Sequence, residues 1–375
     1  MGNVLQLSFP GRSLVGPGCV EGLGSEARKL GSRALLVTGR SALRRAGTTD
    51  RLVALLTDAG LEVELFEQVP PEPDLESVDA ARGRIREASC DVVVEAGGGS
   101  ALDVGKVAAA LAGEDAPAAA FHAGQAIARP GLPHVAVATT SGTGAEVTRN
   151  GVIIDRISRL KKSIRGDGVM PDVSVTDPEL TLSCPPDVTA ASGMDALVQA
   201  IESLFSVHAV PVTEALSLRA AELIVGSLPA ACADGQDLRA RTAMSYGSYM
   251  AGLALGSARL GAVHGLAHPL GLCYGLPHGV VCAVLMPPVL RANAEAEPSQ
   301  YERLRAAVGA DPGEVLDRLM DELRLARTLG PYPNAEWETA IIRYAINSGS
   351  SKANPAPVTE EFVRSVLHEV CSPAP

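Results

Sequence analysis

The residues best suited to chemistry are a carboxylate, an amide and three histidines in the second half of the chain. Asp195 and Gln199 are four residues apart in a segment of helical periodicity, so they share one helix face. His264 and His268 repeat this spacing on a later apolar helix, and His278 follows in the predicted loop 275–279. A divalent cation compensates a buried carboxylate and accepts neutral imidazoles, so this set predicts a metal site.

The crowding of these histidines carries the prediction, since a single one is more often a hydrogen-bonded core residue. Three of the seven histidines fall within fifteen residues of the uncharged stretch 260–290. By length alone that stretch resembles a membrane span, but its four prolines and three histidines favour burial inside a protein. His264 and His268 lack the glutamate of HExxH, so a zinc protease is not supported.

A second feature is the glycine-rich turn Gly97, Gly98, Gly99 and Ser100, between a predicted strand and a predicted helix. Glycine lets an anion approach backbone N–H groups, and a helix N-terminus adds free donors. Ser100 is expected to cap the helix in a capping-box-like arrangement with Asp103. The turn predicts a phosphate or pyrophosphate site, and a tight turn without a ligand stays an alternative.

The spacing within this turn distinguishes it from common nucleotide motifs. Five residues rather than four separate Gly99 from Gly105, and Val107 replaces the Ser or Thr of a P-loop. It is not the usual Rossmann fingerprint either. A second hydroxyl-rich turn, 139–144, also follows a predicted strand, and two such turns in one sheet favour a nucleotide site at the strands' carboxyl ends.

The elements that must position these residues change in type along the chain. The first half alternates β-branched runs with helical segments, which is typical of a parallel sheet. We expect strands at 34–38, 61–66, 91–96 and 134–138, and helices at 49–59 and 75–88. From about residue 181 the chain predicts only helices, among them 188–205, 212–225, 237–255 and 300–308. We therefore expect an α/β domain over 1–180 and an all-α domain over 181–375.

Composition and charge narrow the class of protein further. With 375 residues, 46% of them hydrophobic and 20% charged, the chain is typical of a soluble globular protein of about two domains. Its net charge of −11 disfavours nucleic acid and anionic membrane as partners. Seven scattered cysteines without a CxxC pair favour reduced thiols in a cytoplasmic enzyme.

Several stretches in order along the chain carry a family resemblance: 97–106, 139–148, 177–180, 193–202 and 261–279. Together they resemble the iron-containing alcohol dehydrogenase family, part of a wider group with glycerol dehydrogenase and dehydroquinate synthase. The resemblance implies a Rossmann-like nucleotide-binding domain and a helical domain, with NAD(P) and a divalent metal, iron or zinc, in the cleft between them. It also implies a small aldehyde, ketone or alcohol substrate and a homodimer or larger homo-oligomer.

The same resemblance assigns roles to individual residues. The turn from Gly97 to Ser100, with Asp103, would hold the pyrophosphate; Thr139, Thr140 and Thr143 would line the nicotinamide side; and Lys161 would lie near the cofactor ribose. The metal ligands would be Asp195, Gln199, His264 and His278, and His268 would lie beside the reacting centre.

Two positions depart from the family pattern. Gln199 stands where the fourth ligand is normally histidine, and an amide oxygen is a poorer ligand for iron or zinc. Three outcomes stay open: Gln199 ligates through its oxygen, three residues hold the metal, or no metal binds. Gly39 and Arg40 replace an aspartate that often selects NAD, so we lean to NADP or dual use.

The expected reaction is reversible hydride transfer between the nicotinamide and a small carbonyl compound, with His268 as the proton relay. Three alternatives stay open. One is a metal-free reductase of the same family. Another is an NAD-using lyase or cyclase of the dehydroquinate synthase kind. The third is a catalytically inactive binding protein that has kept the fold.

Overall fold

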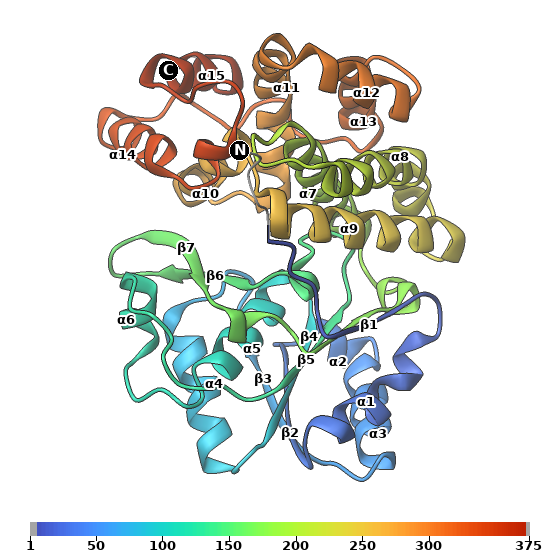
Figure 1. Ribbon diagram of the computed structural model, residues 1–375. Coiled ribbons are helices and arrows are strands. Elements are labelled where there is room, and N and C mark those ends of the chain that lie inside the picture. The colour runs from blue at the N-terminus through green and yellow to red at the C-terminus, as the bar shows by residue number, and fades with distance from the viewer. Residues whose placement is uncertain (1–5, 373–375) are drawn as a thin grey trace. The chain divides into compact units, whose positions relative to one another are not determined.

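The computed structural model describes residues 6–372, which divide into two compact units, 8–184 and 185–372, the latter also including residues 6–7 (Figure 1). The first unit has a parallel sheet with helices, and the second is helical. The fold class predicted from the sequence is therefore confirmed. Each unit is described by itself below.

The first unit is built on a six-stranded sheet in the order β1-β8-β5-β4-β2-β3, with every neighbouring pair parallel. Its strands are β1 (Arg12–Val15), β2 (Arg33–Gly39), β3 (Glu62–Val69), β4 (Val92–Gly97), β5 (His134–Ala138) and β8 (Val173–Thr176). Its helices are α1 (Leu23–Leu30), α2 (Ala42–Arg45), α3 (Thr48–Asp58), α4 (Leu75–Glu87), α5 (Gly99–Ala110) and α6 (Ala118–Ala123). The chain runs outward from β2 to β3 and returns to β4 on the other side of β2, so the topological switch lies between β2 and β4.

Two apolar cores cover the two faces of this sheet. Ala34 and Leu36 pack in one cluster with residues of α1 and α3, whereas Leu35 and Val37 pack in another with residues of α4 and α5. Figure 1 shows these helices on opposite sides of the strands. Successive residues of a strand face opposite ways, so a strand covered on both faces is apolar throughout, as the sequence pattern predicted.

The sequence did not predict the hairpin of β6 (Asn150–Asp155) and β7 (Leu160–Arg165), which pair antiparallel. β7 carries Lys161, Lys162 and Arg165, so it has no apolar run that would indicate a strand. The hairpin is anchored by Ile153 and Ile164, whose side chains are buried in the cluster that contains α4 and α5. Tertiary packing rather than local pattern therefore fixes this element.

The second unit contains nine helices among the described residues: α7 (Pro186–Phe205), α8 (Pro211–Ala233), α9 (Leu238–Ala258), α10 (Ala262–Tyr274), α11 (His278–Ala296), α12 (Pro298–Val308), α13 (Pro312–Glu322), α14 (Ala335–Asn347) and α15 (Glu360–Val370). α7 is buried over most of its length and packs against α8, α9 and α11. The four helices named from the sequence are present, but α8 runs eight residues beyond the predicted end at 225. It continues through Gly226 and Pro229.

One described helix, α8, is long and apolar enough to cross a membrane by length and composition. Core helices of soluble proteins pass the same test, and α8 packs along α7 and α9. The uncharged stretch 260–290 instead forms α10 and the larger part of α11, with a break at Gly275 in the left-handed region (φ 64°).

Candidate functional site

Four potential ligand atoms from three helices of the second unit converge. Asp195 Oδ1, on α7, lies 3.2 Å from His264 Nε2 of α10 and 3.7 Å from His278 Nε2 of α11. Cys282 Sγ, one turn further along α11, lies 3.6 Å from His278 Nε2 and 4.0 Å from His264 Nε2. All four atoms lie within 4.8 Å of one another. We call Asp195, His264, His278 and Cys282 the ligand cluster.

Close helix contacts bring the ligand cluster together. A Cβ added at Gly279 would lie only 1.9 Å from the backbone oxygen of Ala191, so glycine lets the start of α11 approach α7. A Cβ at Gly265 would lie 2.0 Å from Ser351 Oγ, which shows that α10 is equally tightly packed. The ligand positions are therefore set by helix backbones rather than by mobile loops.

Glu202 orients His264 from behind. Its carboxylate accepts hydrogen bonds from His264 Nδ1 at 2.6 Å and from the backbone N–H of Val263, also at 2.6 Å, and it is fully buried. With a proton held on Nδ1, Nε2 is the nitrogen that faces Asp195 and the ligand cluster and would bind a metal. This carboxylate–histidine arrangement is typical of imidazoles that bind a metal.

Electrostatics at the ligand cluster favour positive charge. Burial opposes ionisation of Asp195, but the imidazoles of His278 and His264 outweigh it and lower the pKa of Asp195. Burial likewise opposes a charged His264, but its interactions with Cys282, Glu202 and Asp195 outweigh it and raise the pKa of His264. Burial raises the pKa of the Cys282 thiol to about 12. A divalent cation reverses that preference, because a coordinating thiol is deprotonated.

Gln199 lies beside the ligand cluster but contacts the other oxygen of Asp195. Its Nε2 donates to Asp195 Oδ2 at 3.0 Å, and its Oε1 is buried without a hydrogen-bond partner. A buried carboxylate gathered with two imidazoles and a thiol is a donor set that a divalent cation completes. The donor set therefore fits the metal that the sequence predicted.

The structure corrects the predicted place of His278 and reveals a residue that the sequence reasoning missed. His278 is the first residue of α11 rather than part of a loop, because Pro277 ends the turn and its carbonyl accepts from the N–H of Val281. With His278 on a helix, Cys282 falls four residues later on the same face. That spacing was visible in the sequence but was not used, because a loop has no helical period.

His268 lies next to the ligand cluster without belonging to it. Its ring centroid is 5.5 Å from that of His278, and its Nδ1 lies 3.1 Å from the hydroxyl of Tyr344 on α14. Tyr344 was not singled out from the sequence. The pair places a titratable imidazole and a hydroxyl beside the cluster, which is the chemistry a proton relay needs.

In the first unit, the two glycine- and hydroxyl-rich turns lie together at the carboxyl ends of β4 and β5. Thr139 N–H donates to the carbonyl of Gly97 at 3.0 Å. A Cβ added at Gly98 would lie 3.4 Å from Thr140 Oγ1, and one at Gly99 would lie 2.7 Å from Thr143 Cγ2. The residues proposed for pyrophosphate and nicotinamide therefore form one continuous surface, next to the topological switch.

The predicted cap of α5 is wrong. Gly98 is the N-cap residue and the helix begins at Gly99, so Ser100 already lies inside its first turn. The Ser100 hydroxyl donates instead to the carbonyl of Pro71. This leaves the first N–H groups of α5 without a capping side chain, which preserves them as donors for an anion.

Asp103 is buried within α5 rather than exposed in a capping box. Burial raises its pKa to about 6 against the attraction of Lys106 and Lys161. Burial lowers the pKa of Lys106 to about 8. Lys106 Nζ donates to the carbonyls of Ala145 and Asn150, at 2.6 and 2.7 Å, and so ties α5 to the segment after the second turn.

The other predicted cofactor residues lie at the edges of this region. Lys161 Nζ, on β7, pairs with Glu72 Oε2 at 2.7 Å. Gly39 ends β2, immediately beside β4 in the sheet, and Arg40 follows it with an exposed side chain whose Nε lies 3.4 Å from the carbonyl of Gln68. Gly39 and the glycine turn thus flank the switch between β2 and β4.

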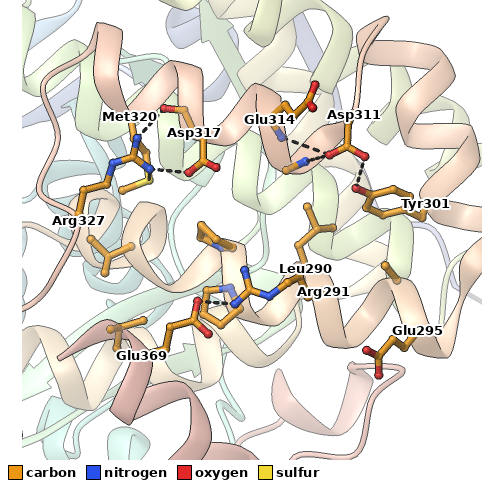
Figure 2. A pocket seen from close by; sticks show the side chains of 16 residues that line it. Leu290, Arg291, Glu295, Tyr301, Asp311, Glu314, Asp317, Met320, Arg327 and Glu369 are labelled. Carbon is orange, nitrogen blue, oxygen red and sulfur yellow. Dashed lines mark hydrogen bonds and ion pairs between the residues drawn. The ribbon is translucent and has the colours of Figure 1, made fainter.

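A cavity of about 620 Å³ in the helical unit lies away from these residues. Figure 2 shows two ion pairs in its lining, Arg291 with Glu369 and Arg327 with Asp317. No residue of the ligand cluster lines it. Both of its arginines are already paired with carboxylates, so the candidate site remains the ligand cluster and the glycine turn.

Comparison with known proteins gives consistent matches over nearly the whole chain. The family model described as iron-containing alcohol dehydrogenase matches residues 10–178, and that of the Fe-containing alcohol dehydrogenase family, C-terminal, matches residues 189–371. The chain is 35% identical to long-chain-alcohol dehydrogenase 1 of Geobacillus thermodenitrificans (strain NG80-2), over 97% of this chain and 96% of that one.

Solved structures agree with these matches. The crystal structure of a 1,3-propanediol oxidoreductase superposes with a TM-score of 0.92 at 33% identity, covering 98% of this chain and 100% of that one. Sulfoacetaldehyde reductase from Bifidobacterium kashiwanohense, solved in complex with NAD⁺, superposes with a TM-score of 0.90 at 30% identity, covering 98% and 99%.

Proposed function

The chain belongs to the iron-containing alcohol dehydrogenase family, and we propose that it reduces a small aldehyde or ketone to its alcohol with metal assistance, and catalyses the reverse reaction. It is an NAD(P)-dependent oxidoreductase that acts on a small-molecule substrate. The observation that carries the metal-assisted part is the ligand cluster, in which Asp195, His264 and His278 converge in a buried site.

The two units divide the reaction between them in this proposal. The domain 1–180 binds the dinucleotide through Gly97–Ser100, Asp103, Thr139, Thr140, Thr143 and Lys161, and the domain 181–375 binds the metal and the carbonyl compound. When bound, the nicotinamide supplies a hydride and the divalent cation supplies Lewis acidity that polarises a carbonyl bond. The N–H groups at the start of α5 bind the pyrophosphate, and the glycines keep side chains out of its way.

His268 is the proposed proton relay. Its Nδ1 is within hydrogen-bond distance of Tyr344 Oη at 3.1 Å, which holds the ring beside the ligand cluster, where the substrate oxygen would be reduced. As an alcohol forms, this imidazole delivers the proton that the oxygen requires, and in the reverse direction it accepts one.

Arg40 supports a preference for NADPH, or use of both cofactors. Its exposed guanidinium follows β2 at the switch, and Gly39 supplies no carboxylate to repel a 2′-phosphate. We also propose a cytoplasmic location, in keeping with the seven free cysteines. The family resemblance supports a homodimer or larger homo-oligomer.

The test is a spectrophotometric screen of small aldehydes with NADH and NADPH, together with elemental analysis of the purified protein. We expect stoichiometric cofactor oxidation, about one divalent ion per chain, and loss of activity in Asp195→Ala. If the purified protein is active without metal and the Asp195→Ala variant keeps full activity, the protein is a metal-free reductase. Turnover without net change in cofactor absorbance would point to lyase chemistry, and nucleotide binding without turnover to a binding protein.

A further inference from the structure

We propose that Cys282 is the fourth metal ligand of this chain, in place of Gln199, and that the resulting Asp-His-His-Cys site selects zinc over iron. The inference rests on the metal-assisted function proposed above, and it assigns a residue that neither the sequence motifs nor the family resemblance points to. It starts from the geometry of the ligand cluster, in which Cys282 takes part as fully as either histidine.

The separations between donor atoms match those around a tetrahedral ion. With zinc–nitrogen and zinc–oxygen distances near 2.0–2.1 Å and zinc–sulfur near 2.3 Å, neighbouring ligand atoms lie roughly 3.3–3.6 Å apart. The observed separations are 3.2 Å from Asp195 to His264, 3.7 Å from Asp195 to His278, and 3.6 and 4.0 Å from Cys282 to the two imidazoles. These four separations lie within about 0.4 Å of the tetrahedral range, and all four donor atoms lie within 4.8 Å of one another.

Gln199 is engaged on the opposite side of the carboxylate. Its amide N–H donates to Asp195 Oδ2, whereas the ligand cluster gathers around Oδ1. This bond fixes the rotation of the Asp195 carboxylate, so Gln199 acts as a positioning residue for a ligand. The position that a fourth imidazole would occupy therefore does not supply a nitrogen donor, and the Cys282 sulfur supplies the missing ligand atom.

The charge and softness of the donors decide which ion fits. Asp195 and a Cys282 thiolate together carry the two negative charges that neutralise a divalent ion, whereas one carboxylate with three neutral ligands would leave a net positive charge buried. Thiolate ligands favour zinc over harder ions. Exchanging an imidazole for a sulfur ligand therefore raises the affinity for zinc more than the affinity for iron. Catalytic zinc expands from four ligands to five, so a fourth protein ligand leaves room for a carbonyl oxygen.

The direct test uses the full chain loaded with Co²⁺, whose thiolate complexes show a charge-transfer band in the near ultraviolet. We expect that band in the wild type and in the control Cys90→Ser, which changes a buried cysteine of the other unit. We expect Cys282→Ser to lose the band while keeping visible ligand-field bands. A wild type with ligand-field bands but no charge-transfer band would overturn the Cys282 assignment and leave the proposed function standing. A wild type that binds no Co²⁺ would overturn both.

X-ray absorption of the zinc-loaded wild type tests the same ligand without any variant, in case Cys282→Ser does not fold. We expect one zinc–sulfur distance near about 2.3 Å, and a shell of nitrogen and oxygen alone would overturn the proposal.

Metal selectivity supplies a third readout. The double variant Gln199→His with Cys282→Ala exchanges the sulfur for an imidazole, so we expect the ratio of iron to zinc affinity to rise at least tenfold over the wild type. An unchanged ratio in a folded, metal-binding double variant would count against sulfur ligation.

Discussion

The carboxylate of Glu202 offers the sharpest test of how the protein prepares its metal site. Glu202→Gln keeps the shape of the side chain but replaces one carboxylate oxygen with an NH₂ group. In the wild type both oxygens accept, one from the N–H of Val263 and one from His264 Nδ1, each at 2.6 Å. Glutamine can accept from only one of these donors. Its NH₂ must face the other.

The magnitude follows from which donor glutamine leaves unpaired. The backbone N–H of Val263 cannot change, so the amide oxygen stays with it and the NH₂ faces His264. The imidazole then moves its proton to Nε2, where it no longer has a lone pair for a metal. Changes of this kind behind a metal-bound histidine typically cost about 10- to 100-fold in metal affinity, which corresponds to about 1.4–2.7 kcal/mol.

The assay is zinc affinity measured by competition with a chromophoric chelator, on the wild type, Glu202→Gln and the control Glu95→Gln. Glu95 forms a similar buried pair with His134, at 2.8 Å, in the first unit. We expect the control to lower zinc affinity little, even if it lowers thermal stability. Equal zinc affinity in Glu202→Gln and the wild type would refute the idea that this carboxylate sets the protonation of His264.

Three further outcomes are expected. Gly99→Ala places a methyl group 2.7 Å from Thr143 Cγ2, so it should weaken dinucleotide binding at least tenfold in a fluorescence titration. The control Gly83→Ala, in helix α4, adds a methyl group that meets nothing within 4 Å and should leave dinucleotide binding unchanged. Asp103 keeps its proton up to about pH 6 in the folded protein but loses it near pH 3.8 in the unfolded chain. As the pH rises from about 4 to about 7, the free energy of unfolding of the wild type should therefore fall relative to that of Asp103→Asn. The fall should be on the order of 2–3 kcal/mol by chemical denaturation, and a constant difference would contradict the burial argument. Gly39→Asp should lower the NADPH-to-NADH ratio of kcat/KM at least tenfold, and an unchanged ratio would show that this position does not read the 2′-phosphate.

Much of the fold was predictable because local pattern and burial agree in the first unit. Strands such as β4 are buried on both faces, so they appear in the sequence as uninterrupted apolar runs, and the glycine turn marks where one of them ends. The hairpin of β6 and β7 was missed because two buried isoleucines in contact with distant residues hold it, and the sequence of β7 has no apolar run.

At the candidate site, residues on recognisable motifs were found and those defined by three-dimensional contact were not. Asp195, Gln199, His264 and His278 follow from spacing and family resemblance together. Cys282 was missed because the start of α11 was interpreted as a loop, which hid a pair of residues one helical turn apart. Tyr344 lies 76 residues beyond its partner His268, and no local pattern connects them. Ser100 was given a capping role because residue type alone does not locate the first residue of a helix.

The residues proposed for the chemistry of the second unit form pairs one helical turn apart: Asp195 with Gln199, His264 with His268, and His278 with Cys282. Six positions on three rigid backbones are more than one ion requires. A single substitution can therefore transfer a ligand from one helix to its neighbour without rebuilding the scaffold. In this proposal the scaffold therefore offers more donor positions than it uses, and a change of ligand needs no change of helix.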